Sequence, residues 1–573
     1  MSNEQDDEPP SPVLDTETEA GIGAGTGPGE PEARIDIAQS TTYLALGTLV
    51  SRITGFARAA LLTALLGVQG AAAYDAFSVA NTVPTQIFVL IAGGFLNAVI
   101  VPQIVRAARN PDGGAAFLNS LLTLTLVAIG VLTAVVVAAA PLVPVVMATF
   151  PAGSATSTLC VAFAFWCLPQ IFGYASYALF GQILNARGQF GAYTWAPILN
   201  NLVAIAGILI MFRWIGPFSH DHHAPATWTA GQIALLGGTA TLGVTVQALA
   251  LLRPLHRAGV RFRPQWGVRA LGLGAVGRVA GWALGTVLVS QVGIVAISRA
   301  STGATDAGGA GRGAYDNALL LFMLPHALVT VSVVTVLFTS ISRAAVAGDR
   351  VGVRSITSAG LRLTGVFTVF ACLAGIVLAP SITRVLFALS TPADATAIAH
   401  ALMAMLLGLI PFSVQHLLQR VFYSFEDART PFLIQIPVVA VTAIGAAVSG
   451  GVLPPSRVVV GIGLSMSAGY LVGAVISGLV LQRRLHARGR RVRRTYTRLL
   501  LAAAVSAATG YGVQRGLQAL LGHRLLPDLA TLVVSGAVMV GVYLLIARLL
   551  GTGELDELRA LVTRQLPHRA PAV

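Results

Sequence analysis

The sequence predicts an all-α polytopic membrane protein of about 14 transmembrane helices, in which two pseudo-twofold-related six-helix lobes are followed by two extra C-terminal helices. The first observation is composition: 55% of the 573 residues are hydrophobic and only 10% are charged, whereas soluble domains carry about 25% charged residues. The second is that long apolar runs alternate with short loops, which favours helices over the alternating strands of a barrel. The third is an internal repeat. The low charge also argues against a nucleic-acid partner, although the formal net charge is +14.

Residues 1–36 form the first element, and their composition predicts a disordered acidic cytoplasmic tail. They contain ten acidic residues against a single base, Arg34, together with much Pro, Gly and Ser. Such a segment cannot bury enough apolar surface to fold. It also lacks the basic start and the apolar core of a signal peptide.

Fourteen apolar stretches follow the tail, and each is long enough to cross a bilayer, which takes about 20 residues of helix. The predicted spans are 40–67, 72–105, 114–148, 156–185, 191–213, 229–253, 274–298, 314–342, 356–380, 396–422, 431–452, 457–482, 498–521 and 527–550.

Arginines in the loops between these spans predict the orientation of the chain. On the side shared by both termini they cluster, above all at 253–269 and 483–498, whereas opposite loops carry single residues such as Arg213 and Arg384. Because cytoplasmic loops are enriched in Arg and Lys, we expect a multi-pass protein with both termini in the cytoplasm. The cluster at 483–498 is also placed to contact anionic membrane lipids.

The internal repeat divides the chain into corresponding halves. ALGTLVS at 45–51 matches ALGTVLVS at 283–290, and AYDAFSVANTVP at 73–84 matches AYDNALLLFMLP at 314–325. Six spans separate the copies, so both enter the membrane in the same orientation, as in transporters built from parallel repeats. The predicted divisions are the tail at 1–36, a first lobe at 37–254, a basic cytoplasmic linker at 255–273, a second lobe at 274–485, a basic loop with the last two spans at 486–551, and a cytoplasmic tail at 552–573.

Ionisable residues inside the spans are the candidates for function, because a charge at bilayer depth costs at least ~2.5–3.5 kcal/mol. The first span contains Arg52 and Arg58, and the second begins with Asp75. One interpretation is a structural ion network among these residues. The other is a cationic cavity for an anionic substrate, since the arginine fork binds phosphate oxygens in pairs.

The second lobe is predicted to carry less charge at matching positions. Gln291 takes the place that corresponds to Arg52. Arg299 and Arg312 flank the outer ends of the seventh and eighth spans, where they either line the cavity or lie at the membrane interface. Arg299 joins the first-lobe residues as a candidate for substrate binding.

The sequence contains no pattern typical of catalysis or metal binding. It has no Walker A motif, no nucleophile paired with a base and no set of convergent carboxylates. Cys160, Cys167 and Cys372 lie in apolar runs, as small core residues do. We therefore expect a transporter without enzyme activity, cofactor or metal site.

Three sequence motifs point to a known family. These are SRITGFAR at 51–58 followed by YDAF at 74–77, NARGQFGAYTWAPILNN at 185–201, and YSFEDARTPF at 423–432. They resemble the opening, the entry to the fifth helix and the signature after the tenth helix of the MurJ/MviN lipid II flippases. That family belongs to the multidrug/oligosaccharidyl-lipid/polysaccharide exporter superfamily, and the resemblance covers roughly residues 37–551.

The resemblance implies a flippase of the bacterial plasma membrane that moves lipid II, the undecaprenyl-pyrophosphate-linked peptidoglycan precursor, to the outer leaflet by alternating access. Its role would lie in peptidoglycan biosynthesis, cell wall biogenesis and cell shape. The resemblance assigns Arg52, Arg58 and Asp75 to a central cavity that binds the headgroup, and the last two spans to a groove for the lipid tail. It also implies cell-wall synthesis and division proteins as partners.

Two positions depart from the family pattern. The second span reads FVLIAGG at 88–94, where some members carry paired arginines, and Leu320 stands at the place of an arginine in the eighth span. The predicted cavity is therefore less cationic than that of the family. Three other functions remain open: a flippase for another lipid-linked oligosaccharide, a cation-coupled drug exporter, and a non-transporting cell-wall scaffold.

Overall fold

The computed structural model describes residues 30–91, 114–187, 189, 191–216, 224–266, 277–486, 489–522 and 524–554. These residues are almost entirely helical, and their only extended pairing is an isolated bridge between Gln69 and Ala310. The helices are α1 (Glu30–Leu66), α2 (Ala72–Ile91), α4 (Ala115–Ala138), α5 (Leu142–Met147), α6 (Ala155–Cys167), α7 (Gln170–Ala186), α8 (Gly191–Ile215), α9 (Ala230–Leu249), α10 (Leu252–Arg257), α11 (Gly277–Asp306), α12 (Arg312–Pro325), α13 (Val331–Val346), α14 (Arg350–Leu386), α15 (Pro392–Leu406), α16 (Leu409–Ser424), α17 (Arg429–Val452), α18 (Val458–Leu485), α19 (Arg490–Leu521) and α20 (Leu525–Leu549), with a π-helical turn, η5 (His326–Thr330), between α12 and α13.

Every predicted span coincides with a helix in the described part of the chain. By length and apolarity, eleven helical stretches of that part qualify as membrane spans, or twelve if α15 and α16, which meet at a 48° bend, are one span. The two remaining predicted spans correspond to α2, which is described only as far as Ile91, and α19, which begins with a run of arginines. The all-helical membrane fold is thus confirmed, while the exact number of fourteen spans is not established.

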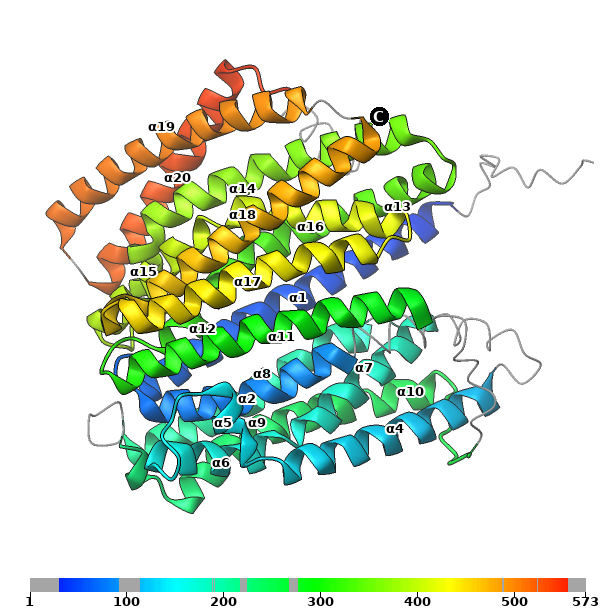
Figure 1. Cartoon of the computed structure of the whole chain (residues 1–573), viewed down its shortest axis with the longest axis vertical. Coiled ribbons are helices and arrows are strands. Elements are labelled where there is room, and N and C mark those ends of the chain that lie inside the picture. The colour runs from blue at the N-terminus through cyan, green and yellow to red at the C-terminus, as the bar shows by residue number, and fades with distance from the viewer. Residues whose placement is uncertain are drawn as a thin grey trace, which may run out of the picture.

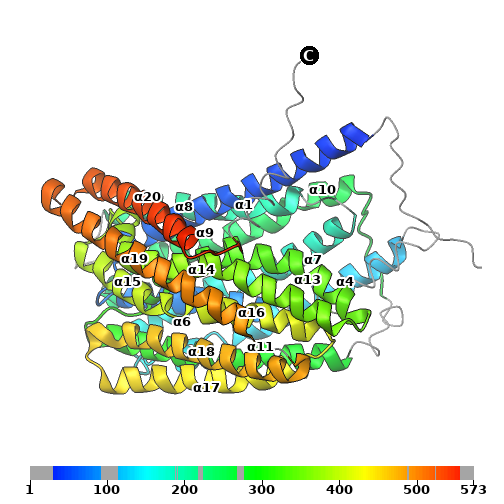
Figure 2. The same cartoon turned by 90° about the horizontal axis from the view of Figure 1, so that it is seen from above.

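The helices form two lobes with matching internal packing. In the first lobe α1 packs on α8, α8 on α9 and α2 on α6; in the second, α11 packs on α17, α17 on α18 and α12 on α15. Figures 1 and 2 show α1 and α11 at the boundary between the lobes, on opposite faces of the molecule. The pseudo-twofold relation expected from the repeat is therefore present in the packing.

The last two helices form a separate pair at the edge of the second lobe. α19 packs along α20, and both contact α14 (Figure 1). The chain after α20 turns back on the lobe, because Glu554 accepts hydrogen bonds from Arg362 Nε at 2.6 Å and Thr495 Oγ1 at 3.1 Å.

The start of the first lobe differs from the sequence expectation. The tail was predicted to extend to residue 36, but α1 begins at Glu30. Once a helix has formed, each further residue adds a backbone hydrogen bond, so the membrane-spanning helix extends into this polar stretch. Residues 1–29 lie outside the described part of the chain.

Helix α1 connects the two hydrophobic cores. Leu61 and Leu62 pack against the core of the first lobe. Phe56 and Ala60, on another face of the same helix, pack against the core of the second lobe. The stretch of α1 around Arg58 therefore lies between the lobes.

Candidate functional site

Arg52 and Arg58 lie on the membrane-spanning stretch of α1, Leu46–Leu66. Both side chains are half-buried. None of the ion pairs among the described residues involves either arginine, and Nε of Arg52 is buried without a hydrogen-bond partner. A guanidinium carries five donors and stays charged, so both positions favour an anion that brings acceptor oxygens.

Arg58 lies at a narrow pocket inside the first lobe. The pocket is lined from α1, α2, α8 and α9, by residues that include Leu62, Phe77 and Thr239. These walls are mostly apolar, which strengthens electrostatic interactions at the guanidinium. None of the residues that line this pocket is acidic, so the pocket itself supplies no counter-charge to Arg58.

Asp75 does not pair with the arginines of α1. Its side chain is fully buried in the first turn of α2, and neither carboxylate oxygen has a well-formed hydrogen bond. The Thr305 hydroxyl lies beside the Asp75 carboxyl group, and the arginine closest to this group in electrostatic effect is Arg312 of the second lobe. The structural ion network considered for Arg58 and Asp75 is thus absent among the described residues.

Arg312 forms the centre of a contact between the lobes, which we call the interlobe latch: Ser78 and Thr82 on α2 with Arg312 and Asp316 on α12. The Arg312 side chain is buried and forms an ion pair with Asp316, Nε to Oδ1, at 3.2 Å. Its Nε also donates to Ser78 at 3.2 Å and its Nη2 to Thr82 at 3.0 Å. Ser78 in turn donates to Asp316. A buried ion pair stabilises only when its remaining donors are satisfied, and the two hydroxyls accept from the Nε and Nη2 donors of Arg312.

Further contacts close the same end of the molecule. The amide of Gly70 donates to the Gly309 carbonyl at 3.0 Å, and Asn317 Nδ2 donates to Thr63 Oγ1 at 2.9 Å. The hydrogen bonds that we observe between the lobes lie in this half of the bundle. We call it the latch end.

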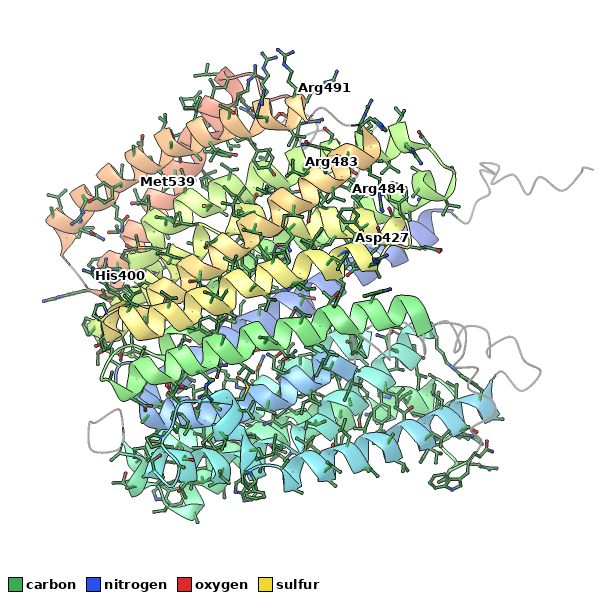
Figure 3. The ribbon with its side chains drawn as sticks, in the orientation of Figure 1. His400, Asp427, Arg483, Arg484, Arg491 and Met539 are labelled. Carbon is green, nitrogen blue, oxygen red and sulfur yellow. The ribbon has the colours of Figure 1, made fainter. Side chains whose placement is uncertain are left out.

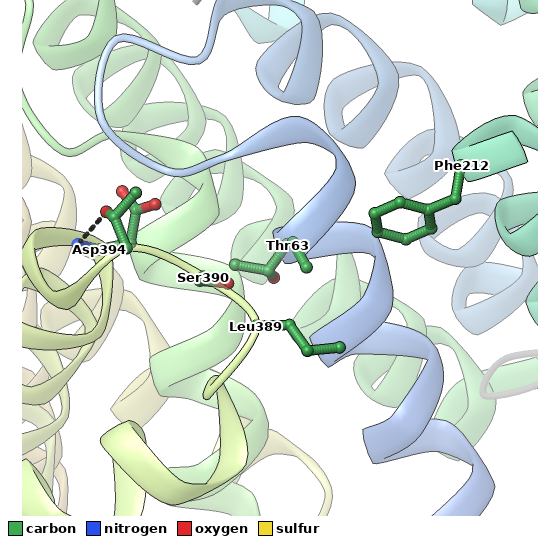
Figure 4. Close-up of a pocket in the computed structure, with 7 residues that line it drawn as sticks. Thr63, Phe212, Leu389, Ser390 and Asp394 are labelled. Atoms are coloured by element: carbon green, nitrogen blue, oxygen red, sulfur yellow. Dashed lines mark hydrogen bonds between the residues drawn. The ribbon is translucent and has the colours of Figure 1, made fainter. Parts of the chain in front are cut away.

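A pocket of about 330 Å³ lies between the lobes at the latch end (Figure 4). The first lobe lines it with Thr63 and Phe212, and the second with Leu389, Ser390 and Asp394, among others. Asp394 also accepts a hydrogen bond from the Gln69 amide at 3.1 Å. The pocket is far smaller than a glycolipid headgroup, so we assign it to the closed end and not to substrate binding.

Arg299 lies apart from the other candidates. Its side chain is exposed near the end of α11, and its Nη1 donates to the carbonyl of Val145 at 2.7 Å. Val145 belongs to α5 of the first lobe. The structure therefore gives Arg299 a contact between the lobes at the latch end, and it brings the residue together with neither Arg52 nor Arg58.

Sequence reasoning did not single out two histidines of the second lobe, His326 on η5 and His416 on α16. Their rings lie 5.0 Å apart between centroids. A histidine inside an apolar span is itself a signal, and His326 directly follows Pro325. The residues are 90 positions apart, however, so only the fold brings them together. No group of three or more metal-binding side chains exists among the described residues.

Comparisons with known proteins agree with this architecture. A family described as lipid II flippase MurJ matches residues 62–530, a region that begins after both arginines of α1. The "Lipid II flippase MurJ" of Burkholderia cenocepacia is 27% identical, over 77% of this chain and 82% of its own. The "Probable lipid II flippase MurJ" of Rhizobium tropici is 28% identical, over 92% and 96%. A solved structure, "Lipid II flippase MurJ, inward closed conformation", has a TM-score of 0.67 at 17% identity and covers 91% of this chain and 99% of its own.

Proposed function

The chain belongs to the MurJ family of lipid II flippases, and we propose that it receives the pyrophosphate of lipid II at Arg52 and Arg58 and moves it across the membrane by alternating access of the two lobes. Family membership rests on the match over residues 62–530. The function as a lipid II flippase follows from it, whereas the binding residues and the orientation are our proposal. That function is a contribution to peptidoglycan synthesis.

The observation that carries the assignment of the site is the absence of a counter-ion. Arg52 and Arg58 are half-buried within a membrane span, and no ion pair of the described residues neutralises either of them. Structural arginines in membranes normally have a partner, because an isolated charge is costly there. A pyrophosphate supplies both negative charge and oxygen acceptors, and it binds the arginine fork through paired hydrogen bonds.

The distribution of arginines supports a cytoplasmic location of both termini. Arg483, Arg484 and Arg491 lie at the end of the bundle opposite His400, which is at the latch end (Figure 3). Since cytoplasmic loops are rich in arginine, the latch end faces outward in our proposal. The closed latch then corresponds to the state that accepts substrate from the cytoplasmic side.

In this mechanism the interlobe latch is the outer gate. With the latch closed, the buried carboxyl group of Asp75 lies near Arg312. Opening the gate separates α2 from α12, so the free energy gained when the substrate neutralises Arg52 and Arg58 must offset the lost latch contacts. A ligand shifts such an equilibrium only by its differential affinity for the two states.

The test is rescue of a bacterium depleted of its own lipid II flippase, with lipid II exposed on the outer leaflet as the readout. We expect wild type to rescue, and Arg52→Ala and Arg58→Ala to reduce exposed lipid II about tenfold or more, since a hydrogen bond to a charged group contributes about 1.5–3 kcal/mol. The matched control is Arg213→Ala, an exposed arginine at the end of α8, which should rescue fully.

The outcomes separate the possible functions. Normal lipid II exposure by both α1 variants at wild-type protein levels would rule out the proposed site. Failure of well-inserted wild type would instead favour another lipid-linked oligosaccharide as the substrate. Rescue that is indifferent to Arg52 and Arg58 but lost on truncation of the tails would favour a scaffold.

A further inference from the structure

We propose that His326 and His416 form a proton-binding site in the second lobe, and that proton occupancy sets the bend between α12 and α13 and so links the movement of the lobes to pH. The site takes one proton shared by two imidazoles. It is distinct from Arg52 and Arg58, and the proposal does not depend on which lipid is carried.

The two rings form a compact pair inside the lobe. They meet edge to face, with centroids 5.0 Å apart and an interplanar angle of 85°. His326 is 5% exposed, and its ring also lies 4.3 Å from that of Phe412. Aromatic packing continues from Phe412 to Tyr470 on α18 at 4.6 Å. Such walls exclude water, so a proton gained or lost here is felt strongly by the surrounding structure.

His326 occupies the point at which the helix is irregular. Pro325 ends α12, and the five residues of η5 form a π-helical turn before α13 begins at Val331. Proline removes one backbone hydrogen bond of a helix and bends it. Single π-helical turns occur frequently at functional sites. A change at His326 is therefore placed to alter the angle between α12, which contains the latch residues, and α13.

The hydrogen bonds around His326 fit a neutral ring. Thr330 donates to Ser413 Oγ at 3.0 Å, which leaves the hydroxyl proton of Ser413 free to point at His326 Nδ1, 3.3 Å away, when the ring is the neutral tautomer with its proton on Nε2. In this arrangement Nδ1 is an acceptor. A proton added at Nδ1 makes it a donor instead, and the Ser413 hydroxyl must find another acceptor. Since Ser413 is on α16, the proton changes how η5 is fastened to α16.

The charges near the pair limit it to one proton. A positive charge on His416 repels one on His326, and the guanidinium of Arg420 repels a positive charge on His416. No described Asp or Glu lies close enough to attract a positive charge on either ring. The titratable neighbour on α18 is Tyr470, which contacts Phe412. Two imidazolium ions at this separation and without a carboxylate would repel each other. One added proton therefore changes the net charge of the pair from zero to one, and a second is excluded.

Exposure increases along α16 from the pair to the surface. His326 is buried, His416 is half-buried, and Arg420 is exposed one turn further toward the end of α16. The guanidinium of Arg420 lies over the ring of Phe338 on α13, 5.7 Å from its centroid. This order of side chains leads from the site to the surface at the end of the bundle opposite the latch.

The experiment measures the conformation of the lobes without any substrate. Spin labels at Arg257→Cys and Val346→Cys, both exposed at the end opposite the latch, report the separation of the lobes in lipid nanodiscs free of lipid II, in a background with the three native cysteines replaced by alanine. We expect the ratio of the two distance populations to change by up to about tenfold per pH unit between about pH 4 and 6.5, as one linked proton requires.

Two variants remove the proton while keeping the size of the side chain. His326→Asn keeps an acceptor near the position of Nδ1, and His416→Gln keeps a polar group at that of Nε2; both should abolish the pH dependence. The control is His400→Gln, an exposed histidine on α15 at the latch end (Figure 3), which should retain it. Thermal melting and gel filtration establish that each variant folds.

Two results would overturn the proposal: distances in the parent protein that do not change with pH, or a pH dependence that persists in both histidine variants. Because no lipid II is present, either result is independent of the rescue assay for Arg52 and Arg58. A failed proton site and a failed substrate site are thus distinguished.

Discussion

The two lobes share one packing framework but carry different charges at equivalent places. By the alignment of the repeat, Arg52 and Arg58 on α1 correspond to Gln291 and Ile297 on α11. Arg58 is half-buried with no ion pair among the described residues, whereas Ile297 is 6% exposed within the core of the second lobe. The helix that lies between the lobes is thus charged in one repeat and apolar in the other.

The aspartates of the repeated AYD motif differ in the same way. Asp75 is fully buried and forms no ion pair with another described residue, while Asp316 is paired with Arg312 and partly accessible. Because α1–α8 packing matches α11–α17 packing, the framework does not require any of these charges. The difference teaches that packing was preserved between the repeats while the charges took separate tasks: in our proposal, substrate binding in the first lobe and gating in the second.

The comparison predicts its largest effect for an exchange of residues between equivalent positions. Ile297→Arg places an unpaired charge in an apolar membrane core, and we expect it to destabilise the protein by at least ~2.5–3.5 kcal/mol, since this is the insertion cost of the charge alone. Arg58→Ile should abolish lipid II exposure without lowering thermal stability, because replacing an unpaired buried charge by a packed apolar side chain is neutral or stabilising. Thermal melting in detergent and the rescue assay measure the two effects.

Gln291→Arg is the control for this exchange, because its position is half-buried and tolerates a long side chain better. A large loss of stability in Arg58→Ile would contradict the comparison, since it would mean that Arg58 holds the first lobe together. An Ile297→Arg variant that is stable and supports transport would also contradict the comparison.

A second prediction concerns the interlobe latch. Arg312→Ala leaves Asp316, Ser78 and Thr82 without their shared partner, and removal of one member of a buried pair costs about 3–5 kcal/mol. We expect a value near the low end, because Asp316 retains some access to solvent. The loss applies to the latched state, so the equilibrium should shift toward an open latch end. The readout is the reactivity of Ser390→Cys, in the interlobe pocket, toward a membrane-impermeant thiol reagent.

Arg299→Ala serves as the matched control for the latch. Arg299 also joins the lobes at this end, but through a hydrogen bond to a backbone carbonyl. Because its side chain is exposed, competition from solvent limits this contact to about 1 kcal/mol. The reactivity of the cysteine should therefore change little in this variant. Equal reactivity in Arg312→Ala and wild type would refute the gating role of the latch.

The sequence predicted the helices well because the signal is local. Each span is a run of apolar residues, and the repeat is visible in text such as AYD at 73–75 and 314–316. Arg52 and Arg58 were also identifiable, since charges in an apolar run stand out. These features depend only on residues that are neighbours in the chain.

Contacts between the lobes could not be predicted in this way. Arg58 was a plausible partner for Asp75 because both were expected at a similar depth on adjacent helices. The structure instead places α12 against α2, so the arginine near Asp75 is Arg312, more than 200 residues away. Apolar periodicity specifies that a helix face is buried, but not which of several helices covers it.

The smallest effect is expected far from the lobe boundary, in the loop between α16 and α17. Asp427 accepts hydrogen bonds from Thr430, at 2.9 Å from its amide and 2.7 Å from its hydroxyl, and from Arg484 Nη2 at 2.8 Å. Burial raises the pKa of Asp427, but these contacts outweigh burial and hold it below the ordinary value of 3.8.

Because the pKa of Asp427 is lowered in the folded protein, its contribution to stability is present above pH 3.8 and is lost as the pH falls through the lowered value. Arg484 is 42% exposed, so solvent screens the pair and the contribution is at most about 1 kcal/mol. Asp427→Asn should therefore lower the melting temperature slightly at pH 7, and the gap to wild type should close on acidification toward pH 3. A gap that stays constant would show that Thr430 and Arg484 do not favour the charged carboxylate. If Asp427→Asn lowered the melting temperature as much as Arg312→Ala does, charge at the end opposite the latch would stabilise the second lobe as strongly as charge between the lobes.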